Sequence, residues 1–434
     1  MIQRERIAHL LPIETSLASD IEVRDYGDAV ILPGLVDTHV HINEPGRTEW
    51  EGFETATRAA AAGGITTLVD MPLNCIPATT NVSALQRKIT AAEGRLVVDC
   101  GFYGGLVPGN AGEIEPLVDA GVLGFKSFLI DSGVDEFRHV GEDDLHRGLP
   151  LLAKMGVPLL VHAELNRSGP EPGAPENQRG DPRKYLNYLH SRPRAWENEA
   201  VDLMTRLSEE YGARVHIVHL SSSDALPVLE AARSKRIPLS VETCHHYLNF
   251  AAEEIPDGHT EFKCAPPIRE KENREKLWAG LRAGTIDFAV SDHSPCLPRL
   301  KTDEGGDFLR AWGGIAGLQF SLSAFNTAAR GRDVSLVDMA RWLCAAPADF
   351  AGLGEHKGRI MPGMDADLAI WNPETEVVVT PEKIYQRHAL TPYAGRTLLG
   401  EVRATYLRGR LIYDTADTGS PFPGGPSGAI LRGA

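Results

Sequence analysis

The stretch Leu35-Val36-Asp37-Thr38-His39-Val40-His41 decides how the rest of the chain is interpreted. It is an apolar run that follows Pro33-Gly34 and ends in a His-x-His pair. Because side chains i and i+2 of a strand share a face, His39 and His41 are expected to point the same way. Two imidazoles projecting together form half of a site for a metal such as zinc. Alone, the pair is equally compatible with two hydrogen-bonded core histidines. A metal site would need further ligands from elsewhere in the chain.

The composition is that of a soluble globular protein with a large core. The chain has 434 residues, of which 42% are hydrophobic and 24% are charged. Its 59 acidic and 44 basic residues give a net charge of -15. This excess of acidic residues argues against binding nucleic acid or an anionic membrane through bulk charge.

Cysteine usage and the N-terminus indicate a cytoplasmic protein. Six cysteines are scattered without a CxxC pair, and we interpret them as reduced thiols. They are Cys75, Cys100, Cys244, Cys264, Cys296 and Cys344. No long apolar segment follows Met1-Ile2-Gln3-Arg4-Glu5-Arg6, so neither a signal peptide nor a membrane span is predicted.

From residue 34 onward, β-rich runs alternate with helical segments. The predicted strands are 35–41, 65–71, 97–103, 124–129, 158–162, 215–220, 239–244 and 286–291. Helices are expected at 51–62, 80–93, 145–154, 197–211, 224–235 and 274–283, several of them closed by glycine. Eight alternations favour a (β/α)8 TIM-type barrel over residues 34–357. The alternative is an open doubly wound sheet, but no glycine-rich phosphate loop follows the first strand.

Both ends of the chain are expected to form a small β-sandwich domain, from residues 1–33 and 358–434. After two further helical segments, 315–330 and 337–344, the pattern changes to short strands with turn residues between them. These strands are predicted at 366–371, 377–379, 404–407 and 411–413. The Pro- and Gly-rich tail from Gly419 is predicted to be poorly ordered.

Candidate metal ligands lie where barrel strands end, which is where barrel enzymes carry their chemistry. Besides His39 and His41, these positions hold Lys126, His162, His219 and Asp292. Burial beside Phe125 and Phe128 would lower the pKa of Lys126, and a neutral amine can take up carbon dioxide to give a bridging carbamate. The alternative for Lys126 is a pair with a buried carboxylate. His216 is not expected to share a face with His219. Together the six residues predict a two-metal site with an aspartate that moves protons.

The order of these ligands resembles the amidohydrolase superfamily, and within it the allantoinase family of cyclic amidases. The resemblance covers Leu32 to Tyr413 and is carried by several stretches. They are His39-Val-His-Ile-Asn-Glu-Pro-Gly-Arg47, Gly64-Ile-Thr-Thr67, Met71-Pro-Leu-Asn74, Gly124-Phe-Lys-Ser-Phe128, Ala265-Pro-Pro-Ile-Arg269, Ser291-Asp-His-Ser-Pro-Cys296, Ala311-Trp-Gly-Gly-Ile-Ala-Gly-Leu-Gln319 and Tyr393-Ala-Gly-Arg-Thr397. The segment before His39 is shorter than the family pattern, which leaves the N-terminal part of the β domain open.

This resemblance implies an enzyme that opens the hydantoin ring of allantoin to give allantoate, a step of purine catabolism. His39, His41 and Asp292 would hold one divalent metal, and His162 and His219 the other. Carboxylated Lys126 and a hydroxide would bridge the two metals, while Asp292 moves the proton. Zinc is expected, with cobalt, manganese, iron or nickel as alternatives. The family also implies a homo-oligomer, a tetramer.

Three other readings are weighed against this one. Dihydroorotases carry an arginine where this chain has Asn43, which fits a neutral substrate such as allantoin better. Hydantoinases or dihydropyrimidinases tend to carry a tyrosine where this chain has Asp131. Asn43, Ser294 and Gly314 are therefore the candidate substrate-binding residues. A non-catalytic assembly homologue would typically have lost metal ligands, and all six are present here.

Overall fold

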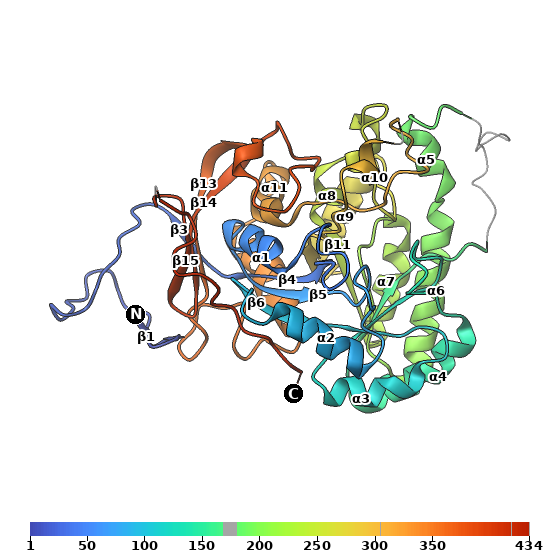
Figure 1. Ribbon diagram of the computed structural model, residues 1–434, viewed down its shortest axis with the longest axis horizontal. Coiled ribbons are helices and arrows are strands. Elements are labelled where there is room, and N and C mark those ends of the chain that lie inside the picture. Colours follow the sequence, from blue (N-terminus) through green and yellow to red (C-terminus); the bar gives the residue numbers. More distant parts are fainter. Residues whose placement is uncertain (168–179, 304, 418, 434) are drawn as a thin grey trace.

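The computed structural model describes residues 1–167, 180–303, 305–417 and 419–433, and its centre is a closed parallel barrel (Figure 1). The barrel strands are β4 (Leu35–Val40), β5 (Ile65–Asp70), β6 (Asp99–Phe102), β7 (Gly104–Gly105), β8 (Phe125–Phe128), β9 (Leu159–His162), β10 (Val215–Ile217), β11 (Leu239–Cys244) and β12 (Phe288–Val290). They pair in chain order, and β6 and β7 together form the third of eight strands, interrupted at Tyr103. His41 N donates to His293 O at 2.8 Å beside the bridge between Val40 and His293, which closes the ring. The predicted barrel is confirmed, and the open sheet is excluded.

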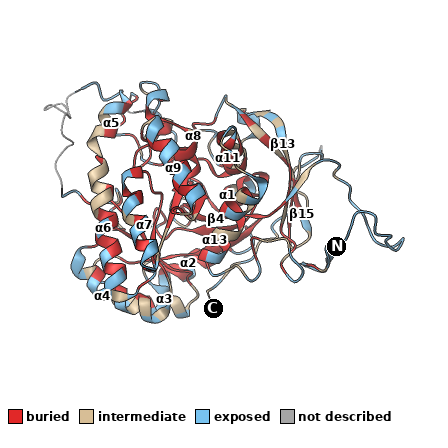
Figure 2. Cartoon of the chain, turned by 180° about the vertical axis from the view of Figure 1, so that it is seen from behind, coloured by how far each residue is buried: buried red, intermediate tan, exposed pale blue. Residues whose placement is uncertain are grey.

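Helices surround the barrel strands and present their exposed faces outward (Figure 2). They are α1 (Phe53–Ala62), α2 (Val82–Ala92), α3 (Ile114–Asp119), α4 (Glu142–Met155), α5 (Tyr185–Ser191), α6 (Arg194–Tyr211), α7 (Leu226–Ser234), α8 (His245–Asn249), α9 (Lys271–Ala283), α10 (Arg299–Thr302), α11 (Ser321–Ala329), α12 (Leu336–Ala340) and α13 (Ala346–Phe350). Gly156, Gly212 and Gly284 end α4, α6 and α9 in the left-handed conformation that favours glycine. The six predicted barrel helices are confirmed, with ends shifted by a few residues.

A four-stranded antiparallel sheet lies beside the barrel and joins the two ends of the chain (Figure 1). Its order is β15 (Arg410–Asp414), β14 (Thr397–Leu407), β13 (Leu368–Val378) and β3 (Val30–Pro33). One face packs on the barrel helices, and Thr405 Oγ1 donates to Ala61 O at 2.7 Å. The predicted β domain from both ends is confirmed, and on the N-terminal side it is completed by β3 and by the short pair β1 (Ile2–Gln3) and β2 (Arg6–Ile7).

The prediction of a poorly ordered tail is wrong for its last residues. Gly428 N and Leu431 N donate to Leu96 O and Cys100 O, and Ile430 forms a parallel bridge with Cys100. Ala429 N also donates to Asp99 Oδ1 at 2.7 Å. The tail therefore extends along β6, because this strand offers backbone groups that the composition of the tail itself does not reveal.

All six cysteines are buried free thiols, in agreement with the sequence analysis. Within the described ranges, every helix is too short or too polar to cross a bilayer.

Candidate active site

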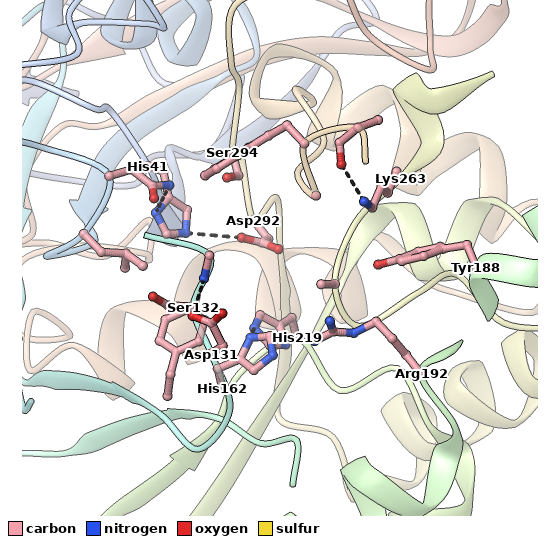
Figure 3. Close-up of a pocket in the computed structure, with 18 of the residues that line it drawn as sticks. His41, Asp131, Ser132, His162, Tyr188, Arg192, His219, Lys263, Asp292 and Ser294 are labelled. Atoms are coloured by element: carbon pink, nitrogen blue, oxygen red, sulfur yellow. Dashed lines mark hydrogen bonds and ion pairs between the residues drawn. The ribbon is translucent and has the colours of Figure 1, made fainter. Parts of the chain in front are cut away.

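The predicted ligands converge on one cavity of about 420 Å³ at the ends of the barrel strands (Figure 3). His39, His41, Lys126, His162, His219 and Asp292 all line it, although they come from five different strands or the residues that follow them. The fold thus brings together six residues that are separated by up to 253 positions in the sequence (from 39 to 292). Because all six side chains line one cavity, the alternative that the histidines are unrelated core residues does not account for their positions.

His39, His41 and Asp292 form the first group. Asp292 Oδ1 lies 3.1 Å from His39 Nε2 and 3.6 Å from His41 Nε2. Burial alone would raise the pKa of Asp292, but the two imidazoles hold it well below its ordinary value. Burial also lowers the pKa of both histidines, and the neutral imidazole is the form that offers a nitrogen lone pair to a metal. The three side chains have the ligand atoms and the spacing that a divalent metal requires.

His162 and His219 form the second group. His162 Nδ1 lies 3.0 Å from His219 Nε2, so these two nitrogens face each other (Figure 3). On the other side of its ring, His162 Nε2 lies 2.7 Å from Glu164 Oε2, and Arg192 pairs with the same carboxylate. Burial lowers the pKa of both imidazoles. Glu164 therefore fixes the orientation of His162, with Nδ1 directed toward His219.

Lys126 interacts electrostatically with the histidines of both groups, and its amine lies 5.0 Å from the centre of the Phe128 ring. Its side chain is buried, and Nζ makes no hydrogen bond within the described part of the chain. Burial lowers the pKa of Lys126 to about 7, although the carboxylates of Asp292 and Glu242 act in the opposite direction. A buried amine without a partner is costly. Within the described residues, the structure therefore gives Lys126 no paired carboxylate, which was the alternative predicted from the sequence.

Two of the predicted ligands have backbones in the left-handed region, where residues other than glycine are uncommon. His219 has φ 41° and Asp292 has φ 44°. Such strain persists only where the surrounding structure imposes it, and it concentrates at functional sites. Their side chains are aimed into the cavity at the expense of local backbone preference.

Several residues that contact the predicted ligands were not predicted from the sequence. Glu242 Oε1 lies 2.5 Å from His39 Nδ1, and Asn74 Nδ2 lies 3.3 Å from His41 Nδ1. Glu164, described above, does the same for His162. Glu164 follows His162 by two positions and Glu242 lies in predicted strand 239–244, so alternation along the strands could have indicated both. His216, as expected, does not line the cavity.

The three predicted substrate-binding residues are placed differently from one another. Ser294 lines the cavity. Asn43 is buried, and its Nδ2 donates to Pro295 O at 3.1 Å. Gly314 N donates to Lys263 O at 3.0 Å, and its neighbour Gly313 lines the cavity in its place. Substrate binding by these residues stays a prediction, and Ser294 is the best placed of them.

Comparison with known proteins agrees with this geometry. Residues 30–412 match the model of the amidohydrolase family, and the chain belongs to this family. Among its relatives, an allantoinase from Streptomyces avermitilis is 50% identical over 407 residues, which are 94% of this chain and 89% of the relative. An allantoinase from Saccharomyces cerevisiae is 47% identical, covering 91% and 85% of the two chains. One from Escherichia coli K12 is 40% identical, covering 94% and 90%.

Solved structures with this fold include other cyclic amidases. An L-hydantoinase from Arthrobacter aurescens superposes with a TM-score of 0.87 at 30% identity, covering 99% of this chain and 95% of the other. A dihydropyrimidinase from Brevibacillus agri gives 0.86 at 25% identity, covering 100% and 94%. The fold is thus shared with a hydantoinase and a dihydropyrimidinase, while the sequence is more similar to the allantoinases named above.

Proposed function

We propose that this protein hydrolyses allantoin to allantoate by opening its hydantoin ring. The observation that carries the proposal is the convergence of all six predicted ligands on one cavity, in a chain 40–50% identical to the allantoinases above. A non-catalytic assembly homologue would have no reason to keep this set. The residue division proposed from the sequence, a catalytic barrel at 34–357 with a β domain from both ends, fits this function.

The residues present fit a centre of two divalent metals, with zinc as the first candidate. His39, His41 and Asp292 would hold one cation, His162 and His219 the other, and a carboxylated Lys126 would bridge them. Two such cations polarise a scissile carbonyl and make water nucleophilic at neutral pH. The neutral imidazoles and the unpartnered amine of Lys126 support this assignment.

The chain's own residues would supply proton transfer and substrate orientation. Asp292, ionised and facing His39 and His41, accepts the proton of the attacking water and returns it to the leaving ring nitrogen. Glu164 and Asn74 keep the rings of His162 and His41 oriented. Ser294, at the cavity wall, is placed to hold a ring oxygen or nitrogen through its hydroxyl.

The residue at position 43 favours a neutral substrate over an anionic one. Dihydroorotases carry an arginine there to hold the carboxylate of their substrate, and this chain has the uncharged Asn43. Of the cationic side chains that line the cavity, Arg192 pairs with Glu164 and Lys263 donates to Ala311 O. Family resemblance further supports a cytoplasmic homo-oligomer, a tetramer.

We expect allantoin to be turned over fastest in a panel that also contains dihydroorotate, dihydrouracil and hydantoin. The metal-loaded enzyme is assayed with each compound, and kcat/KM values are compared. Faster turnover of dihydroorotate or dihydrouracil would contradict the assignment of the substrate while leaving the metal centre in place.

Activation of metal-free protein is expected to depend on bicarbonate and to speed up as pH rises through about 7. The reason is that the pKa of Lys126 is lowered to about 7, so its reactive neutral form dominates only above this pH. The rate of activation is measured from pH 6 to 8.5 with metal and dissolved carbon dioxide held constant, because at constant bicarbonate the share present as carbon dioxide falls as the pH rises. A rate that falls with rising pH, or that ignores bicarbonate, would argue against carboxylation.

A further inference from the structure

A line of hydrogen-bonded side chains runs from the metal ligand His39 away from the cavity. Glu242 lies at its centre: Oε1 is 2.5 Å from His39 Nδ1, and Oε2 is 3.1 Å from His216 Nε2. Beyond it, His216 Nδ1 lies 2.8 Å from Ser240 Oγ. Neither Glu242, His216 nor Ser240 lines the cavity. These three residues have no place in the function proposed above.

The chemistry of a carboxylate fixes the protons along this line. An ionised Glu242 only accepts hydrogen bonds, so His39 must donate from Nδ1 and His216 from Nε2. His39 Nε2 is then left with its lone pair, on the side that faces Asp292. His216 Nδ1 accepts from the hydroxyl of Ser240. Burial lowers the pKa of His216 to about 3, in keeping with a neutral ring that has one N–H.

The His216 ring is held in place by the aromatic side chains packed against it. The His216 ring stacks on Phe288 with centroids 5.2 Å apart and an interplanar angle of 10°, and its centroid lies 4.1 Å from that of Phe350. The side chains of Glu242 and His216 are fully buried. A pair that is locked by packing can hold His39 in one orientation and one tautomer.

The contacts of Glu242 are a second observation. Among the described residues, its ion-pair contacts are with His39 and His216 only, without an arginine. Glu164, the comparable carboxylate beneath His162, pairs with Arg192. A divalent metal on the far side of the His39 ring would add positive charge beside the buried carboxylate of Glu242.

We propose that Glu242 is a positioning residue for the metal held by His39, and that His216 acts through Glu242. The proposal rests on the metal centre of the proposed function. It makes Glu242 a source of negative charge and orientation for His39, while the substrate is recognised elsewhere.

The test is metal affinity, measured by chelator competition on purified protein without substrate. Glu242→Gln keeps the size of the side chain but removes the charge and replaces one of the two acceptor oxygens with an NH2 donor. The expected result is about 10–100-fold weaker binding of one metal equivalent. The matched control is Glu51→Gln, because Glu51 Oε2 also lies close to a buried histidine, His293 Nε2 at 3.2 Å, that does not line the cavity. The control should bind metal like the wild type.

Equal affinity in Glu242→Gln and wild type would overturn the inference while leaving allantoin hydrolysis standing. Loss of affinity to the same degree in Glu51→Gln would also overturn it, because the effect would then be general destabilisation. Wild-type protein that binds no metal would remove the metal centre and the inference together.

A second variant keeps the test informative if Glu242→Gln folds poorly. His216→Gln should weaken the metal less than Glu242→Gln does, and the double variant should bind no more weakly than Glu242→Gln alone. Additive losses would show that His216 acts independently of Glu242 and would refute that part of the proposal. Thermal unfolding of the metal-free variants separates lost metal affinity from lost stability.

Discussion

Asp292→Asn is expected to reduce kcat by about 10²–10⁴-fold while the protein keeps much of its metal. An amide still offers one oxygen to a cation, but it cannot take a proton from water and return it to the leaving nitrogen. The backbone should tolerate the change, because asparagine accepts the left-handed conformation that residue 292 adopts at φ 44°. Metal content and kcat are measured on the same preparation.

Asp131→Asn is the matched control for this prediction. It makes the same substitution on another carboxylate that lines the cavity, but Asp131 does not belong to the close group formed by His39, His41 and Asp292. The control is expected to retain most of its kcat and all of its metal. Near-normal kcat in Asp292→Asn would remove Asp292 from proton transfer, and loss of metal in parallel with kcat would reduce its role to that of a ligand.

Strand and helix periodicity were sufficient to predict the barrel, because each of its eight strands is a short apolar run between helical segments. The same periodicity did not predict the first and last residues of each strand. Predicted strand 97–103 shortens to Asp99–Phe102, with a second piece at Gly104–Gly105, since Tyr103 breaks the pairing between them. The tail was misjudged because its order depends on pairing with β6, a long-range contact that composition does not encode.

The candidate ligands were predictable because barrel enzymes place their chemistry at strand ends and because His-x-His is a local pattern. The residues that contact these ligands were harder to predict from the sequence. Glu242 is separated from His39 by 203 positions, and only the barrel places the two side chains together. Asn43 and Gly314 were chosen by analogy, yet Asn43 Nδ2 and Gly314 N already donate to Pro295 O and Lys263 O. Of these two residues, Asn43 keeps a side-chain oxygen, Oδ1, that has no hydrogen-bond partner among the described residues. Short-range sequence patterns do not reveal such competing partners.

Lys126→Ala is expected to lose metal and activity together. If Lys126 is carboxylated, it supplies the anion between two cations, and its removal leaves them facing each other with little negative charge between. The absence of any hydrogen-bond partner for Nζ within the described residues supports this role. Metal content and kcat are measured after reconstitution with excess metal.

Rescue by small carboxylates distinguishes this role from a structural one. The space left by the side chain should accept formate, acetate or propionate, and each should restore part of both metal content and kcat. Lys126→Arg should not be rescued, because the guanidinium stays positive, cannot form a carbamate and fills the space.

Lys263→Ala is the matched control, because Lys263 lines the same cavity and burial lowers its pKa to about 7 as well. Its Nζ, however, donates to Leu309 O and Ala311 O at 3.1 and 2.5 Å, so it is already satisfied as an ordinary amine (Figure 3). This variant should keep its metal and gain nothing from formate. Both lysines therefore have a lowered pKa. Lys126 differs from Lys263 because its Nζ has no hydrogen-bond partner among the described residues. An unmodified Lys126 in fully active enzyme, by intact mass or electron density, would refute the carbamate and require another bridging ligand.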